Sequence, residues 1–398
     1  MKIIHVTASL SRLAAGISQS IWNFAREERA LGHDVRLVGL RDNYTEQDIP
    51  ADLGCPFRAA RSIVLCSFGY SSDMASVLAE ESAGADIIHA HGLWLYPGIL
   101  ACRRAHASGI PRMVSIHGML EPWAYRHRAW KKRIAWRLFE HRNLRQAACL
   151  HATSEKEAAN IRALGLTNPI AVIPLGIDPA PYRSPAPTPR IRKLLAETGG
   201  KRILLFLSRF HAVKGPDRLL EAWRQLAPRF PGWHLVLAGP DEQGYRAILE
   251  EQAQRVGVAD RVTFTGPVYD ADKYALLAAA ELFVLPTHSE NFGLVIVEAL
   301  AAGLPVITTK GAPWADLVTH QCGWWVDSGA APLATVLGEA MSLPPAALRE
   351  MGLRGRSFVG ARYAWPVLAG RMAETYEWLR RGGVRPAHME RMAGERLG

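Results

Sequence analysis

The sequence predicts an α/β protein built from two doubly wound domains that face a central cleft. Three observations support this prediction. The chain has 398 residues, which is too many for one ordinary hydrophobic core. Short runs rich in β-branched residues alternate with amphipathic stretches in both halves, as in the βαβ units of open parallel sheets. A proline-rich segment at 179–189 interrupts this pattern once, and we interpret it as the linker between the domains.

The first half contains six runs with the composition of buried strands, and the first of them begins near the N-terminus. Amphipathic stretches at 18–31 and 155–164 are typical of helices that pack on such a sheet. The predicted strands are 3–6, 35–39, 87–91, 113–117, 149–153 and 170–173.

The second half repeats the alternation after the proline-rich segment. The predicted strands are 203–207, 234–238, 262–265, 282–285 and 306–308, and the predicted helices are 216–226, 244–256, 273–279 and 293–302. We therefore expect domains at 1–180 and 181–364. Residues 365–398 are expected to form a helix that crosses back to the first domain, followed by a tail.

The composition is typical of a soluble globular protein. Hydrophobic residues make up 49% of the chain and charged residues 21%, and no apolar run reaches the roughly 18–20 residues that a membrane span needs. The five cysteines are scattered, which favours reduced thiols in a cytoplasmic protein over a disulfide framework or a zinc site. The net charge of +10 is compatible with nucleic acid, an anionic small molecule or a membrane surface as partner.

The most informative segment is 287–305, which follows the predicted strand 282–285. A loop leads into a helix that begins near Gly293 and ends at Gly303. The free N–H groups at the start of that helix suit a diphosphate, and Gly293 lets a ligand approach the backbone closely. Glu298 lies inside the helix among apolar neighbours, where a carboxylate needs donors such as the two hydroxyls of a ribose.

Two cations lie in the loop after the first strand of the second half. Arg209 and Lys214 precede the predicted helix 216–226. Because the carboxyl ends of parallel strands meet at one edge of a sheet, we expect both to lie close to the loop that holds Glu290. Cations at this edge are well placed to bind a diphosphate.

These residues resemble a known family. The sequence Ser208-Arg209-Phe210 with Lys214-Gly215, the spacing of Glu290 and Glu298, and IPLGID at 173–178 are similar to the retaining glycosyltransferases of family 4, also called group 1. Members of this family have the two-domain GT-B fold with Rossmann-like domains, and many act in bacterial polysaccharide or lipopolysaccharide synthesis. The resemblance covers nearly the whole chain and is most specific in the second domain.

The resemblance implies roles for the matching residues of the second domain. Arg209 and Lys214 would hold the donor diphosphate, Glu290 would contact the transferred sugar, and Glu298 would bind the ribose hydroxyls. The other residues implied to contact the nucleotide-sugar are Asn291, Phe292, Gly293, Leu294 and, beside the base, Val268.

The first domain matches the family more loosely. Gly16 lies in the position of the family's glycine-rich loop, where a second glycine is often present and is absent here. His117 ends a predicted strand where the family has a histidine that touches the donor sugar, so we assign it to the catalytic set. His91 ends the preceding predicted strand and is expected on the acceptor side.

The implied reaction moves a hexose from a UDP- or GDP-sugar to a hydroxyl of a glycan or lipid-linked saccharide. No cofactor and no metal are expected, because two cations and a helix N-terminus can stabilise the leaving diphosphate. Asp270-Ala271-Asp272 has the DxD form of metal-dependent enzymes, but acids at the start of a helix also explain it. A nucleotide-sugar epimerase of the same fold and a non-catalytic binding partner remain as alternatives.

A basic, aromatic segment at 123–145 carries eight Lys or Arg residues and one acid. Interleaved tryptophans and leucines favour an element that lies on an anionic membrane surface, and an amphipathic helix with a solvated basic face is the alternative. The sequence lacks a nucleic-acid-binding motif, so nucleic acid is not expected as a partner. We therefore expect a cytoplasmic enzyme, peripheral on the inner face of the membrane.

Overall fold

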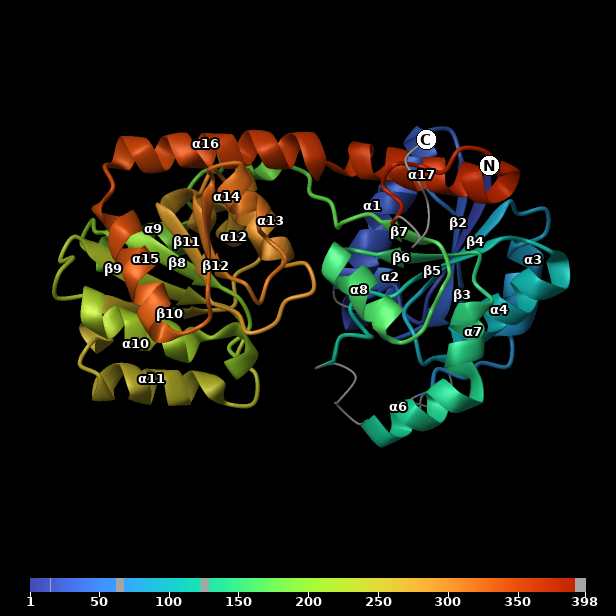
Figure 1. Cartoon of the computed structure of the whole chain (residues 1–398), viewed down its shortest axis with the longest axis horizontal. Coiled ribbons are helices and arrows are strands. Elements are labelled where there is room, and N and C mark those ends of the chain that lie inside the picture. The colour runs from blue at the N-terminus through green and yellow to red at the C-terminus, as the bar shows by residue number, and fades with distance from the viewer. Residues whose placement is uncertain (15, 62–67, 123–128, 391–398) are drawn as a thin grey trace. The chain divides into compact units, whose positions relative to one another are not determined.

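The computed structural model describes residues 1–14, 16–61, 68–122 and 129–390, and it divides into two compact units (Figure 1). The first unit comprises Met1–Gly176 together with the chain from Trp365 onward, and the second is Ile177–Ala364. The division falls after Gly176, whereas the sequence-based boundary was placed after residue 180.

The proline-rich segment is not a free linker. It belongs to the second unit, where Tyr182 is buried and the Thr188 side chain caps the helix α9 (Pro189–Glu197). Proline fixes the backbone without preventing side-chain burial, so the composition of 179–189 was misinterpreted.

The first unit is built on a sheet of seven parallel strands in the order β3-β2-β1-β4-β5-β6-β7. The chain order reverses between β1 and β4, so the loops after these two strands border the crevice where such sheets bind ligands. The strands are β1 Lys2–Val6, β2 Asp34–Arg41, β3 Phe57–Arg61, β4 Ile87–His91, β5 Arg112–Ser115, β6 Cys149–Ala152 and β7 Ile170–Val172.

Helices cover both faces of this sheet. On one face, alternate strand residues such as Ile3 and Ile87 pack against α1 and the C-terminal helix α17. On the other face, Ile4 and Ile88 pack against α3 and α4. The helices are α1 Gly16–Ala30, α2 Thr45–Asp48, α3 Met74–Glu81, α4 Tyr96–Ser108, α6 Ala129–Ala135, α7 His141–Arg145, α8 Glu155–Ala163 and α17 Trp365–Arg381, with a π-helical turn at Trp136–Glu140.

The second unit contains six parallel strands in the order β10-β9-β8-β11-β12-β13, with the reversal between β8 and β11. Its strands are β8 Arg202–Leu207, β9 Trp233–Ala238, β10 Val262–Gly266, β11 Leu282–Leu285, β12 Val306–Thr309 and β13 Gly323–Val326. Its helices are α9 Pro189–Glu197, α10 Pro216–Leu226, α11 Tyr245–Arg255, α12 Asp270–Ala279, α13 Leu294–Ala301, α14 Asp316–Thr319, α15 Ala330–Ser342 and α16 Pro345–Arg362.

Both sheets agree with the predicted fold class, with two local corrections. The strands β3 and β13 were missed, and β5 ends at Ser115, before the predicted end at His117. His117 has a φ of 54°, a left-handed conformation that a strand cannot contain. Within the described residues, no helix is long and apolar enough to cross a membrane.

Candidate functional site

In the second unit, the loops after the neighbouring strands β8 and β11 are joined to each other. The Val213 carbonyl accepts hydrogen bonds from the His288 amide (2.7 Å) and from the Thr287 hydroxyl (3.0 Å). Gly215 has a φ of 72°, and a Cβ there would lie 2.2 Å from the Pro286 carbonyl oxygen. Only glycine fits this contact, so the two loops form one rigid edge at the reversal point of the sheet.

This edge carries an ion pair between two predicted site residues. Nζ of Lys214, after β8, lies 2.5 Å from Oε2 of Glu290, after β11. Their side chains are only 11% and 16% exposed, so each charge depends on the other for compensation. The Glu290 amide also donates to the Gly311 carbonyl (3.0 Å), which fixes the backbone that presents the carboxylate.

The helix α13 begins directly beyond this pair. Gly293 precedes its first residue, Leu294, with a φ of 84°, and a Cβ on it would lie 3.1 Å from the Glu290 side chain. Phe292 is buried, and its carbonyl accepts a hydrogen bond from the Trp314 indole. Asn291 donates its backbone N–H to Oε1 of Glu290 (3.2 Å). The predicted loop residues therefore surround Glu290 at the positive end of a helix.

Glu298 has partners that the sequence did not reveal. Its Oε1 accepts hydrogen bonds from Lys273 Nζ (2.6 Å) and the Tyr182 hydroxyl (3.0 Å). Burial and the nearby Glu298 carboxylate raise the pKa of Tyr182. Protein donors therefore already compensate this carboxylate, and ribose binding by Glu298 stays a prediction.

Arg209 forms its ion pair with Glu242 and not with Glu290. It is half exposed and donates through Nη1 to Oε2 of Glu242 (2.6 Å), a residue that follows β9. Its binding to a diphosphate stays a prediction. The packing of a base on Val268, which is buried after β10, also stays a prediction.

The DxD acid Asp272 stabilises the start of α9. It accepts hydrogen bonds from the side chains of Thr188 (2.6 Å) and Arg190 (3.3 Å).

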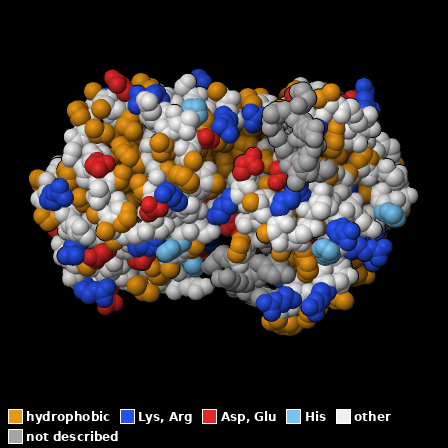
Figure 2. All heavy atoms as spheres, in the orientation of Figure 1, with side chains coloured by type: hydrophobic (Ala, Val, Ile, Leu, Met, Phe, Trp, Pro, Cys, Tyr) orange, Lys and Arg blue, Asp and Glu red, His pale blue; other side chains and the backbone are white. Residues whose placement is uncertain are grey.

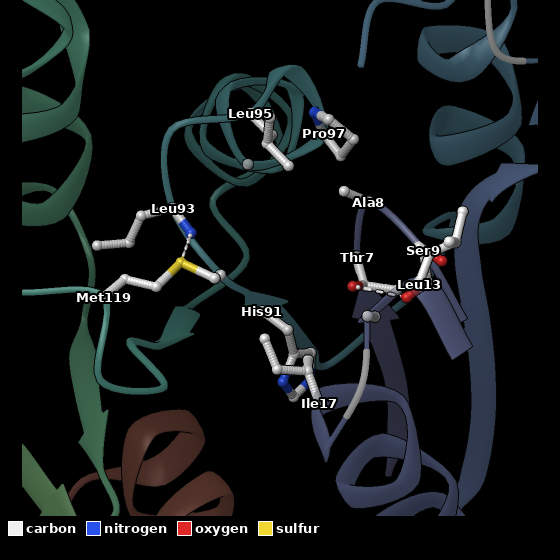
Figure 3. Close-up of a pocket in the computed structure, with 13 residues that line it drawn as sticks. Thr7, Ala8, Ser9, Leu13, Ile17, His91, Leu93, Leu95, Pro97 and Met119 are labelled. Carbon is white, nitrogen blue, oxygen red and sulfur yellow. Dashed lines mark hydrogen bonds between the residues drawn. The ribbon is translucent and has the colours of Figure 1, made fainter. Parts of the chain in front are cut away.

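The first unit contains a pocket of about 260 Å³ between the loops after β1 and β4 (Figure 3). Figure 3 shows Leu95 and Pro97 toward one end, with His91 and Ile17 toward the other. Its walls are mainly apolar. The lining residues are Thr7, Ala8, Ser9, Leu13, Ala14, Ile17, His91, Gly92, Leu93, Leu95, Pro97, Gly98 and Met119.

His91 lines this pocket, and its assignment to the acceptor side stays a prediction. Its Nε2 lies 2.9 Å from Nδ1 of His5, and its Nδ1 lies 3.2 Å from Nε2 of His117. Both nitrogens are therefore engaged within the protein, and the ring offers the pocket carbon atoms. Burial lowers the pKa of His91 well below the ordinary value, and burial with the neighbouring His151 lowers that of His117 to about 3.

Gly16 is the first residue of α1 and is exposed. A Cβ built there meets no atom within 4 Å, so the protein itself gives no steric reason for glycine. Contact of this loop with a phosphate stays a prediction.

Comparison with known proteins agrees with this architecture. The family model described as "Glycosyl transferases group 1" matches residues 187–356, and "Glycosyl transferase 4-like domain" matches residues 15–176. The D-inositol 3-phosphate glycosyltransferase of Thermobispora bispora is 30% identical over 329 residues, covering 78% of this chain and 74% of that protein. A Segniliparus rotundus protein of the same name is 32% identical over 243 residues, which span 58% of this chain and about half (53%) of that relative's length.

Other similarities extend over almost the whole chain. The GDP-mannose:cellobiosyl-diphosphopolyprenol alpha-mannosyltransferase of Xanthomonas campestris is 26% identical over 382 residues, covering 94% of this chain and 96% of that protein. The structure of Anabaena Alr3699/HepE with UDP and glucose is 22% identical, with a TM-score of 0.74 over 95% of this chain and 99% of that one. At this identity, the structural match shows the fold alone.

Proposed function

Because the chain belongs to the group 1 glycosyltransferase family, we propose that it moves a hexose from a UDP- or GDP-sugar to a sugar hydroxyl, with retention of configuration. The proposed acceptor is a glycan or lipid-linked saccharide of cell-surface polysaccharide synthesis. The Xanthomonas campestris relative supports this class, since its name gives GDP-mannose as donor and a polyprenol-linked saccharide as acceptor.

The Lys214–Glu290 pair is the observation that carries the proposal. It lies at the reversal point of the second sheet, where such sheets bind nucleotides, and directly before the N-terminus of α13. A diphosphate would be bound by Lys214 and the first amides of α13, while Glu290 would accept hydrogen bonds from the hydroxyls of the transferred sugar. Arg209 is half exposed and would turn from Glu242 to the diphosphate.

The proposed chemistry is electrostatic. The leaving nucleoside diphosphate gains negative charge in the transition state, and a fixed cation with a helix N-terminus stabilises that charge without a metal. Glu298, held by Lys273 and Tyr182, would receive the ribose hydroxyls. The acceptor hydroxyl would attack from the face of the leaving phosphate, which would take its proton, and His117 would contact a sugar hydroxyl.

The basic segment supports a membrane-bound acceptor. Its residues 123–128 lie outside the described part, but α6 and the following turn expose Trp130 (65%), Ile134 (50%) and Leu138 (75%) at a spacing of four residues. Lys and Arg side chains lie beside hydrophobic ones there (Figure 2). We propose that this face lies on the anionic inner surface of the cytoplasmic membrane.

Vesicle sedimentation tests the membrane proposal. The wild type should bind vesicles with anionic lipid at low salt, and the double variant Trp130→Ser/Leu138→Ser should lose most of this binding. Leu353→Ser, on an exposed position of α16, is the matched control. Wild-type protein that stays in the supernatant contradicts a membrane surface role.

Thermal unfolding with UDP-, GDP- and ADP-sugars tests the donor site. One nucleotide class should raise the melting temperature of the wild type and of Lys193→Ala, a change at an exposed surface pair. It should not raise that of Lys214→Ala. If Lys214→Ala responds like the wild type, the donor site lies elsewhere.

A further inference from the structure

The first unit contains a buried network of side chains that includes His91 and His117. The register of the sheet assembles it, since His5 on β1 lies opposite His89 on β4. Helices α1 and α17 cover the same face and contribute Glu28 and Tyr376. We call this network the histidine cluster, and its members are His5, Glu28, His89, His91, Ser115, His117, His151 and Tyr376.

Three hydrogen bonds join Glu28 to His117 in one line. Oε2 of Glu28 lies 2.8 Å from Nε2 of His5, and Nδ1 of His5 lies 2.9 Å from Nε2 of His91. Nδ1 of His91 lies 3.2 Å from Nε2 of His117. His5 and His91 thus use both ring nitrogens. Nδ1 of His117 has no hydrogen-bond partner in the part of the chain that the structure describes, and His117 is only half buried.

The rings of His91 and His117 lie where a positive charge is unfavourable. His5 and His91 are 1% and 7% exposed. Burial, reinforced by the neighbouring rings, lowers the pKa of His91 well below the ordinary histidine value, and the pKa of His117 falls to about 3. A neutral imidazole has one N–H and one lone pair, so each ring donates through one nitrogen and accepts through the other.

Glu28 determines which atom donates and which accepts in each hydrogen bond of this line. Its Oε1 accepts a hydrogen bond from the Tyr376 hydroxyl (3.2 Å), so both carboxylate oxygens act as acceptors. A neutral His5 then donates to Oε2 through Nε2 and keeps a lone pair on its Nδ1. His91 donates to that lone pair through Nε2, and His117 donates to His91 in the same way. The proton of His117 is therefore on Nε2, and its Nδ1 keeps a lone pair.

We propose that Glu28, His5 and His91 are positioning residues that fix His117 in the Nε2–H tautomer, so that Nδ1 accepts a hydrogen bond from a hydroxyl of a bound sugar. This inference rests on the proposed function. A hydroxyl that donates to Nδ1 keeps its oxygen lone pairs for other contacts or for attack. The opposite tautomer would present an N–H and occupy one of those lone pairs instead.

The tautomer itself is the first test, and it needs no substrate. Long-range proton–nitrogen correlation spectra of ¹⁵N-histidine-labelled protein distinguish a protonated ring nitrogen from one with a lone pair. The signals of His117 are identified by their loss in His117→Gln. We expect a proton on Nε2 and none on Nδ1 in the wild type at pH 7. A proton on Nδ1 overturns the proposal even if the protein is an active transferase.

Glu28→Gln tests the cause. The amide has one acceptor and one donor group, and the donating Tyr376 hydroxyl retains the oxygen, so the NH₂ group faces His5 and reverses the line. We expect His117 to change to the Nδ1–H tautomer and kcat to fall by about tenfold, the effect of losing one hydrogen bond. KM for the nucleotide-sugar should change less than kcat, because other residues are proposed to bind the nucleotide and the diphosphate.

Glu27→Gln makes the same change one position away, outside the cluster, and should leave both the tautomer and kcat unchanged. If Glu28→Gln keeps the wild-type tautomer, Glu28 is not the residue that sets it. A metal ion is the competing explanation of the cluster, since nitrogens of His5, His89 and His91 lie within 4.8 Å of one another. One equivalent of metal in the purified protein would overturn the proposal, because metal would replace the proton between His5 and His91.

Discussion

The pairing of Lys214 with Glu290 predicts separate effects on stability and on ligand binding. Replacing Lys214 by Met leaves the Glu290 carboxylate, which is 16% exposed, without this cation. Breaking a fully buried pair costs about 3–5 kcal/mol, and the partial exposure here reduces our expectation to about 2 kcal/mol of unfolding free energy. The double variant Lys214→Met/Glu290→Gln removes the uncompensated charge and should recover most of that loss.

Ligand-induced stabilisation should behave differently. A nucleotide-sugar at about 100 times its Kd adds about 2.7 kcal/mol to the stability of a protein that binds it only when folded. We expect this increment in the wild type and in neither variant, because both lack the cation that we propose binds the diphosphate. Urea unfolding of the three proteins, each with and without ligand, measures all six free energies. Recovery of the ligand increment in the double variant would refute the role of Lys214 in binding.

Three further predictions concern other parts of the two units. Gly215→Ala should destabilise the second unit by more than about 1 kcal/mol, which is the cost of a left-handed backbone conformation alone. The added Cβ would also lie 2.2 Å from the Pro286 carbonyl oxygen. An unchanged urea midpoint would contradict this prediction. Tyr182→Phe removes one of two donors to Glu298 and should weaken nucleotide-sugar binding about three- to tenfold, a loss of about 1 kcal/mol. Calorimetry measures this loss, and Tyr269→Phe, a change at an exposed tyrosine, is the control. Buried histidines should make the first unit acid-sensitive, because burial lowers the pKa of His151 from 6.5 to about 4 in the folded protein. The contribution of His151 to the unfolding free energy is complete above pH 6.5 and is lost progressively as the pH falls toward 4. At pH 5 the loss is about 2 kcal/mol. Unfolding free energies that do not change between pH 7 and pH 5 would contradict the last prediction.

Local signals explain which elements were predictable. The helix α10 was placed correctly because Gly215-Pro216 marks its start and its apolar residues repeat at helical spacing. The strand β3 was missed because its sequence, Phe-Arg-Ala-Ala-Arg, carries arginines suited to the edge of a sheet and few apolar residues. The strand β13 is only four residues long and begins with a glycine before Trp-Trp-Val, so its signal was equally weak.

Site residues were predictable where they lie in the loop that directly follows a predicted strand. Lys214 and Glu290 follow strands that prove to be neighbours, so the rule on strand ends sufficed to bring them together. Tyr182 and Lys273 were missed because they lie far from Glu298 in the sequence, 116 residues away for Tyr182 and 25 for Lys273. Such a pairing depends on the order of the strands and on side-chain reach, which the sequence pattern does not contain.

The histidine cluster had a partial signal in the sequence. His89 and His91 are two residues apart on a strand, so they project to one face. Glu28 gave none, since the surrounding Ala-Arg-Glu-Glu-Arg-Ala is typical of a solvated helix face, whereas Glu28 is fully buried. Only the packing of α1 and α17 on the sheet reveals its connection to His5.

Release of the nucleoside diphosphate reports directly on the proposed sugar transfer. Purified protein would be incubated with UDP- and GDP-sugars, with and without a bacterial lipid-linked saccharide fraction, and both the released nucleotide and the sugar product would be quantified. We expect release that depends on the acceptor fraction, appears with one nucleotide class, and is lost in Lys214→Met. Conversion of the sugar without any acceptor would identify an epimerase, and no turnover under either condition would contradict the transferase.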